Sequence, residues 1–164
     1  MLFVVLLGGA HPKANIELHD IAFALGDSLV ETYDQLRAAW FASPRHVHID
    51  GWMEVEGVDG YRIEWRSETA PTDEPRLYFV HLGGYESGFF GEAHEHLLVA
   101  ALNATEAKQK AKAKLSKPWQ SPHTDALFEV AGCIPSEVAH GLHLRLVPGE
   151  YKENVVHSEY VVME

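Results

Sequence analysis

Histidines and carboxylates occur in this chain as closely spaced pairs. The sequence has 11 histidines among 164 residues, and two kinds of pair, Glu-x-His and His-x-Asp, each occur twice. The pairs are Glu17 with His19, Glu92 with His94, His48 with Asp50, and His123 with Asp125. Residues i and i+2 of a strand point to the same face, so each pair would present an imidazole beside a carboxylate. Such groups can bind zinc or nickel, or can perform acid and base chemistry near neutral pH.

These residues are candidate ligand-binding residues, but a structural role explains them as well. A Glu-x-His pair at the start of a strand can hydrogen-bond the glycine loop before it, and a fold that needs this brace twice would repeat it. From the sequence we favour bracing over a binding site, and a binding site over a metal or catalytic centre. We predict no cofactor and no metal, and we assign no catalytic residue. If a metal binds, the candidates are His19, His94 and His96.

The polar pairs belong to an internal repeat with a spacing of 75 residues, the distance from Glu17 to Glu92. Residues 2–9 return as residues 77–84 without a gap. Over residues 2–57 and 77–132, 14 of 56 aligned pairs are identical, where ordinary composition would give roughly three or four by chance. The sequence therefore predicts a tandem duplication.

The first copy is expected to place the pairs on strands that flank a helix. Residues 2–7 are apolar without alternation, which is typical of a strand buried on both faces, and Gly8-Gly9 is expected to end it. Residues 17–25 and 46–56 are predicted strands that carry the Glu-x-His pair and the His-x-Asp pair.

A capping box and an apolar face predict the helix between these strands. Ser28 with Glu31 three residues later is typical of a helix start. The apolar face has spacings of four, three and four, and consists of Leu29, Tyr33, Leu36 and Trp40. Asp59-Gly60 then predicts a hairpin turn before a fourth strand at 61–65.

The second copy repeats this order of elements. Its strands are predicted at 77–82, 92–102, 123–130 and 142–147. Asn103, with Glu106 three residues later, is predicted to cap a helix that runs to about residue 115. His81, within the apolar strand, is predicted to be a satisfied core histidine.

The order of elements predicts an α+β fold in which each ββαββ unit is a β-grasp (ubiquitin-like) roll, with one helix across a small mixed sheet. The copies are expected to pack about a pseudo-twofold axis, because the second strand is apolar on both faces. The predicted domains are 1–66, the first repeat; 67–75, a linker; 76–148, the second repeat; and 149–164, a tail that could supply an edge strand.

This predicted fold separates the polar pairs within one copy. In a β-grasp roll the second and third strands lie on opposite sides of the central pair. We therefore expect Glu17 and His19 to lie far from His48 and Asp50, and to meet such residues only across copies.

Two motif strings carry a resemblance to a known family. They are Leu7-Gly8-Gly9 with the following residues 11–20, HPKANIELHD, and Gly83-Gly84-Tyr85 with the later residues 90–94, FGEAH. With these strings the chain resembles the bacterial DUF1543 family, whose members carry one or two copies of this unit. The resemblance covers nearly all of the chain except the C-terminal tail. It implies a duplicated fold and supplies no catalytic residues, because the function of the family is unknown.

The overall composition limits the partners. The net charge is −11, and an acidic surface repels phosphates, so we predict no nucleic-acid partner and no membrane partner. Cys133 is the single cysteine, which favours a reducing, cytoplasmic location over a disulfide-bonded secreted one. No stretch reaches the 18 or more apolar residues of a membrane span.

The sequence therefore favours a non-enzymatic bacterial protein that binds a small molecule or a protein partner between its two repeats. A homodimer is compatible with this hypothesis. The alternatives are a metal-dependent or His/carboxylate enzyme, and a purely structural interaction module that uses its tail.

Overall fold

The computed structural model describes residues 1–43 and 46–164. These residues form two compact units, which are described separately. The first unit comprises Met1–Glu56, Glu137–His140 and Lys152–Glu164, and the second comprises Gly57–Ser136 and Gly141–Tyr151. Both contain antiparallel strands and a short helix, so the predicted α+β class is confirmed.

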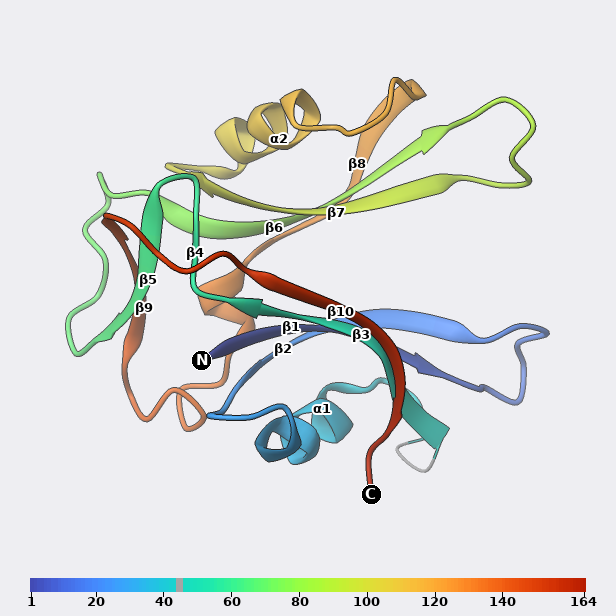
Figure 1. The fold of residues 1–164 in the computed structure, drawn as a ribbon, viewed down its shortest axis with the longest axis horizontal. Helices are drawn as coiled ribbons and strands as arrows, with labels where there is room; N and C mark the ends of the chain where they lie inside the picture. Colours follow the sequence, from blue (N-terminus) through green and yellow to red (C-terminus); the bar gives the residue numbers. More distant parts are fainter. Residues whose placement is uncertain (44–45) are drawn as a thin grey trace. The chain divides into compact units, whose positions relative to one another are not determined.

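The first unit is built around strand β1. Its sheet contains β1 (Leu2–Gly9), β2 (Leu18–Leu25), β3 (Val47–Val55) and β10 (Val155–Val162), in the order β10-β3-β1-β2 (Figure 1). β1 pairs with β2 on one side and with β3 on the other, and it is buried along nearly all of its length. This burial explains why its sequence is apolar without alternation. β10 is an edge strand next to β3, so the C-terminal tail supplies an edge strand to the first unit.

A short helical segment connects β2 to β3. It comprises the 3-10 turn η1 (Val30–Thr32) and helix α1 (Tyr33–Ala39). The predicted apolar face is confirmed, since all of its members lie in or against the core under the sheet. They are Leu29, Tyr33, Leu36 and Trp40. The predicted capping box forms only in part, because Glu31 accepts a hydrogen bond from the backbone N of Asp27 at 2.8 Å but no side chain caps η1.

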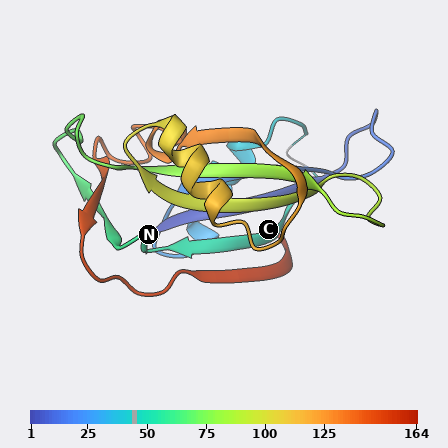
Figure 2. The same cartoon turned by 90° about the horizontal axis from the view of Figure 1, so that it is seen from above.

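The second unit contains a sheet with the same central arrangement. The sheet has the order β7-β6-β8 and comprises β6 (Arg76–Tyr85), β7 (Ala93–Ala101) and β8 (Gln120–Glu129). Helix α2 (Ala104–Ala113) lies over one face of this sheet (Figure 2), where Ala107 and Ala111 are fully buried. Asn103 accepts a hydrogen bond from the backbone N of Glu106, and Glu106 accepts one from the backbone N of Leu102. The predicted cap of this helix is therefore confirmed.

The second unit also contains a separate three-stranded sheet. It comprises β4 (Gly57–Val58), β5 (Tyr61–Arg66) and β9 (His143–Pro148), in the order β4-β5-β9. Asp59 and Gly60 connect β4 to β5 with positive φ angles of 54° and 85°. Two consecutive positive φ angles are typical of the two-residue turns that close hairpins, so this predicted turn is confirmed. The 3-10 turn η3 (Val130–Cys133) follows β8.

The strand pairing corrects the predicted β-grasp roll. Every strand pair of the described residues is antiparallel, whereas that roll requires a mixed sheet. In addition, the last predicted strand of each copy does not join the sheet of its own copy. β5 pairs with β9 instead, with Ile63 opposite Leu146. The predicted domain border at residue 66 consequently differs from the border between the units at Glu56 and Gly57.

Candidate functional site

The polar pairs of the first unit converge on one glycine. Gly8 of β1 lies opposite His19 of β2 on one side and opposite His48 of β3 on the other. Opposite residues of neighbouring strands share a face, so both imidazoles flank Gly8. A Cβ atom at Gly8 would collide with the side chains of Asp50 and His48. The missing side chain therefore leaves the space over the central strand open to groups from both neighbouring strands.

The four residues that meet there are called the first cluster. They are Glu17, His19, His48 and Asp50. The prediction that these pairs lie far apart within one copy is wrong. They meet because β1 is the only strand between β2 and β3, and because Gly8 places no side chain between the two pairs.

The adjacent glycine, Gly9, faces the opposite side of the sheet. A Cβ atom at Gly9 would lie 2.8 Å from Cζ2 of Trp40, whose ring belongs to the core beneath α1. The first cluster is therefore on the face that points away from this core, since successive residues of a strand face opposite sides. Gly8 and Gly9 are the last two residues of β1, so the strand ends at this glycine pair but includes both residues.

A β-bulge places Asp50. The register between β1 and β3 shifts between Leu6 and Leu7, which lie opposite Gly51 and Ile49, so that Asp50 is the extra residue. A bulge turns a side chain away from the direction that strict alternation would give it. Beyond Asp50 the alternation of faces along β3 is shifted by one residue, so that Trp52 packs against the core of the first unit.

The nitrogen and oxygen atoms of the first cluster alternate in a closed ring. His48 Nε2 lies 3.1 Å from Glu17 Oε1 and 3.4 Å from Asp50 Oδ1. His19 Nε2 lies 3.1 Å from Asp50 Oδ2 and 3.6 Å from Glu17 Oε2. Each carboxylate thus presents one oxygen to each imidazole.

The second unit contains the same ring, called the second cluster. It consists of Glu92, His94, His123 and Asp125. His123 Nε2 lies 2.7 Å from Glu92 Oε1 and 3.1 Å from Asp125 Oδ1. His94 Nε2 lies 3.3 Å from Glu92 Oε2 and 3.6 Å from Asp125 Oδ2. All eight residues selected from the sequence therefore lie in one of two clusters, four in each unit.

The backbone around the second cluster matches that around the first. Gly83 lies opposite His94 and His123, and a Cβ atom there would collide with Asp125 and Glu92. The register between β6 and β8 shifts between His81 and Leu82, which leaves Asp125 as the extra residue. On the other face, the ring of Trp119 covers Gly84 as Trp40 covers Gly9.

Several polar atoms in the clusters lack a hydrogen bond. Among the described residues, His48 Nε2, Asp50 Oδ2 and Glu92 Oε1 are buried atoms without a hydrogen-bond partner, although each is at ion-pair distance from a cluster neighbour. His48 is only 8% exposed. Each atom lies close to a partner group in its own cluster, but donor and acceptor are not aligned for a hydrogen bond. A brace would be expected to align them, because buried polar atoms are normally hydrogen-bonded.

His123 has a defined tautomer. Its Nδ1 lies 2.9 Å from the carbonyl oxygen of Ser121, which can only accept a hydrogen bond, so Nδ1 carries the proton. Nε2 then faces the carboxylate oxygens of Glu92 and Asp125. The Ser121 carbonyl is the main cause that raises the pKa of His123, and the two carboxylates add to it. An imidazole that donates through one nitrogen to a backbone carbonyl is a common arrangement of metal-binding histidines.

The second cluster has two further histidines beside it. The ring of His81 stacks against His94 with ring centres 4.6 Å apart, and against His96 at 4.8 Å. Burial, followed by the neighbouring histidines, lowers the pKa of His96 to about 4 and also lowers that of His81. His81, His94 and Asp125 form one set of converging ligand groups, whereas His96 belongs to none of the sets found among the described residues.

Comparisons with known proteins place the chain in a family. The model of a Domain of Unknown Function (DUF1543) matches residues 14–65, which contain the whole first cluster. The crystal structure of protein Il1583 from Idiomarina loihiensis is 36% identical, and the similarity covers 98% of this chain and 94% of that chain with a TM-score of 0.70. The chain belongs to the DUF1543 family. The resemblance that the sequence motifs indicated is thereby confirmed. No curated protein matches the chain.

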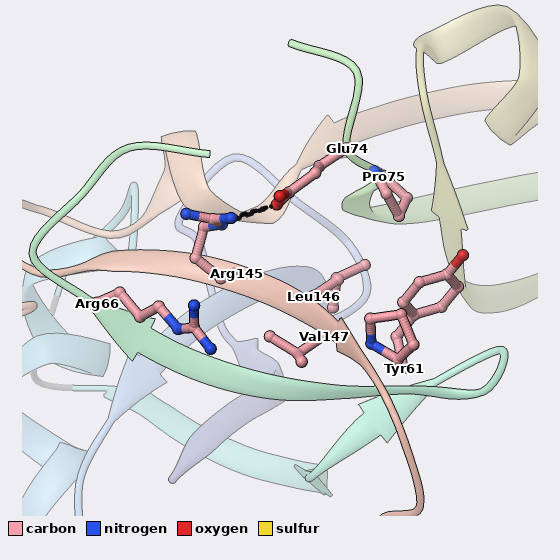
Figure 3. Close-up of a pocket in the computed structure, with 8 residues that line it drawn as sticks. Tyr61, Arg66, Glu74, Pro75, Arg145, Leu146 and Val147 are labelled. Atoms are coloured by element: carbon pink, nitrogen blue, oxygen red, sulfur yellow. Dashed lines mark hydrogen bonds and ion pairs between the residues drawn. The ribbon is translucent and has the colours of Figure 1, made fainter. Parts of the chain in front are cut away.

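This DUF1543 chain has a further pocket, which is separate from the clusters. The pocket lies at the β5–β9 sheet of the second unit and has a volume of about 300 Å³ (Figure 3). Its lining residues are Tyr61, Arg66, Glu74, Pro75, Arg145, Leu146, Val147 and Pro148. Arg145 is buried and is paired with Glu74, and Arg66 is paired with Glu64. None of the eight cluster residues lines this pocket.

Sequence reasoning missed two features of the clusters in this DUF1543 chain. It expected Gly8 only to end a strand, although the repetition of this glycine at Gly83 was a signal of close approach in a strand. It also assigned His81 to the core and did not predict that its imidazole converges with His94 and Asp125.

Among the described residues, no helix is long and apolar enough to cross a membrane.

Proposed function

We propose that this protein binds a divalent transition-metal cation in each unit. The ligands are three residues in each case, called the first triad and the second triad. They are Glu17, His48 and Asp50 in the first, and Glu92, His123 and Asp125 in the second. The observation that carries this proposal is the convergence of their ligand atoms, which lie within 4.8 Å of one another in each set.

The spacing of the ligand atoms suits a metal ion. Around a tetrahedral zinc ion with bonds of about 2.0–2.1 Å, neighbouring ligand atoms are about 3.3–3.4 Å apart. In the first triad, His48 Nε2 is 3.1 Å from Glu17 Oε1 and 3.4 Å from Asp50 Oδ1. Small side-chain movements are sufficient to place one ion between these atoms.

The lack of hydrogen bonds favours a cation over a structural brace. His48 Nε2 and Asp50 Oδ2 are buried and without a hydrogen-bond partner among the described residues, and leaving such atoms unpaired costs about 1–3 kcal/mol each. A cation held by Glu17, His48 and Asp50 would bind directly to His48 Nε2 and to the Asp50 carboxylate. In the second triad, His123 already has its Nδ1 proton directed to Ser121, so Nε2 is available to a metal.

The chemistry of the ligands indicates the class of ion. One imidazole and two carboxylates suit Zn²⁺, Mn²⁺, Fe²⁺, Co²⁺ or Ni²⁺ better than a soft ion that prefers thiolates. The net charge of −11 attracts cations in general. Three protein ligands leave a coordination position of the ion open to water or a small molecule. The proposal is therefore compatible with the small-molecule partner that the sequence predicts.

The two triads support the tandem duplication that the sequence predicts. The pairings Gly8–His19 and Gly8–His48 correspond to Gly83–His94 and Gly83–His123 at the spacing of 75 residues. The two β-bulges correspond at the same spacing. The single cysteine, which is free, supports a reducing, cytoplasmic location for the protein.

Metal titration tests the proposal. Purified protein treated with a chelator and then dialysed is titrated with Zn²⁺, Co²⁺ and Mn²⁺ in separate experiments, with calorimetry and metal analysis as readouts. We expect saturable binding of at least one ion per unit. Glu17→Gln and Glu92→Gln, which keep the side-chain shape and remove the charge, should each weaken binding at one site by about tenfold or more.

A charge-matched substitution controls for the change in net charge. Glu137 is exposed and lies outside both triads, so Glu137→Gln should leave the titration unchanged. Circular dichroism establishes that all three variants are folded. The proposal is overturned if the wild-type protein shows no saturable binding of these ions, or if Glu17→Gln and Glu92→Gln bind them as the wild type does.

A further inference from the structure

The second unit contains a second group of metal-ligand atoms next to the second triad. His81 Nε2 lies 3.9 Å from Asp125 Oδ2, and His94 Nε2 lies 3.6 Å from the same oxygen. The ligand atoms of His81, His94 and Asp125 all lie within 4.8 Å of one another. Asp125 therefore belongs to two sets of converging groups.

We infer that the second unit binds two transition-metal cations, which Asp125 bridges through its two carboxylate oxygens. The inference rests on the proposed function and extends it. Oδ1 of Asp125 faces His123 at 3.1 Å, whereas Oδ2 faces His94 and His81. A carboxylate that presents one oxygen to each ligand set is suited to bridge two ions, which in two-metal sites are about 3.5–4 Å apart.

The ligands are divided between the two ions. The first ion is held by Glu92, His123 and Asp125, as in the proposed function. The second ion is held by His81, His94 and Asp125. No ligand other than Asp125 is used twice, so that each ion has three protein ligands.

His81 is suited to be a metal ligand. Its ring is half-buried and stacked against that of His94, on the face of β6 that carries the second cluster. Imidazole nitrogen is a common ligand of transition-metal ions.

The first unit lacks this second set. Leu6 stands at the position that corresponds to His81, two residues before Gly8. His19 Nε2 still lies 3.1 Å from Asp50 Oδ2, but the second imidazole is replaced by an isobutyl group. The chain therefore binds three ions, one in the first unit and two in the second.

The number of ions per chain tests this inference. Metal-free protein is loaded with excess Zn²⁺, and the stoichiometry is measured by native mass spectrometry and by metal analysis after dialysis. The wild type should bind three ions per chain, and His81→Leu should bind two. The leucine is the residue of the first unit at this position, so the strand accommodates it. Conversely, Leu6→His should raise the number to four.

A neighbouring histidine gives the matched control. His96 pairs with His81 across β6 and β7 and belongs to no ligand set among the residues that the structure describes, and Ile21 corresponds to it in the first unit. His96→Ile should keep three ions. As an independent readout, Mn²⁺-loaded wild type should show a spin-coupled electron paramagnetic resonance signal that His81→Leu lacks.

The outcomes separate the two proposals. Two ions in both the wild type and His81→Leu would overturn the bridged pair and leave the proposed function intact. Three ions in both proteins would overturn the assignment of His81 as a ligand. If the wild type binds no ion, the proposed function fails and the bridged pair fails with it.

Discussion

His19 Nε2 lies 3.1 Å from Asp50 Oδ2, although the two residues are on strands that are not neighbours in the sheet. β2 and β3 are separated by β1, and neighbouring strands are about 4.8 Å apart, so the two strands are about 10 Å from each other. Side chains span this distance only if the residue between them has none. Gly8 meets this condition, and the whole first cluster depends on it.

A methyl group at this glycine should disrupt the cluster. In Gly8→Ala, the added Cβ overlaps with Asp50 and His48, so the ring of ligand atoms opens and binding of Zn²⁺ in the first unit is lost. Overpacking costs about 1–3 kcal/mol, so the variant should stay folded. Calorimetric titration, together with circular dichroism, measures both effects.

Two other glycines control for this substitution. Gly132→Ala has no atom within 4 Å of the added Cβ and should change neither metal binding nor stability. Gly9→Ala presses on Trp40 on the other face, so it should lower stability and leave the metal affinity of the folded protein unchanged. If Gly8→Ala binds metal as the wild type does, the close approach of the side chains over Gly8 is not needed for the site.

The sequence predicted the residues of the clusters but not their arrangement. Repetition of Glu17 at Glu92, and of His48 at His123, identified the polar groups of the clusters, because residue types that are repeated at one spacing are visible without a structure. Alternation along a strand indicates which face a residue takes, but it does not indicate which strands are neighbours. For this reason the two pairs of each unit were expected to be far apart.

Two further features were not predictable from local patterns. The β-bulges that place Asp50 and Asp125 add one residue to a strand, and nothing in an alternating sequence marks the insertion. β5 pairs with β9, whose residues are far away in the chain. The apolar pattern of each strand is compatible both with this distant partner and with a strand of its own copy. The helix that packs through Leu36 was predicted well, because its face is determined by spacing within one element.

The two helix starts should respond differently to removal of the predicted cap. Asn103 accepts a hydrogen bond from the backbone N of Glu106 at 3.0 Å, whereas no side chain of the described residues caps η1 near Ser28. Asn103→Ala should therefore lower the free energy of unfolding by about 1 kcal/mol. Ser28→Ala should have a much smaller effect. Denaturant unfolding at pH 7 compares the two, and equal losses would contradict the difference in capping.

The buried Arg145 should make the second unit sensitive to loss of Glu74. Arg145 is 9% exposed, and its Nε donates to Glu74 Oε2 at 3.0 Å. Glu74→Gln removes the negative charge and leaves a buried guanidinium with a weaker partner, so we expect a loss of about 1–3 kcal/mol in unfolding free energy. The exposed pair of Lys117 with Glu86 is the control, and Glu86→Gln should cost less than about 1 kcal/mol. Equal effects of the two substitutions would show that burial of Arg145 contributes nothing.

His96 should make folding sensitive to mild acid. Burial, together with the nearby His81 and His94, lowers its pKa to about 4 in the folded protein. The unfolded chain, in which the pKa is near 6.5, therefore takes up a proton that the folded protein resists. Stability is thus fully present above about pH 6.5 and is lost progressively as the pH falls toward 4.

Replacing this histidine by the residue of the first unit isolates its contribution. His96→Ile cannot be protonated, so its unfolding free energy should decrease less than that of the wild type between pH 7 and pH 4.5. Because the His96 ring is partly solvated, the difference should be about 1–2 kcal/mol and not the roughly 3 kcal/mol of the full shift. Denaturant unfolding of metal-free protein at the two pH values measures it, while NMR titration of the wild type follows the His96 ring directly. The prediction fails if the His96 ring titrates near pH 6.5 in the folded wild type and if the unfolding free energies of the wild type and His96→Ile change in parallel with pH. Such a result would show that the His96 ring is not shielded from water.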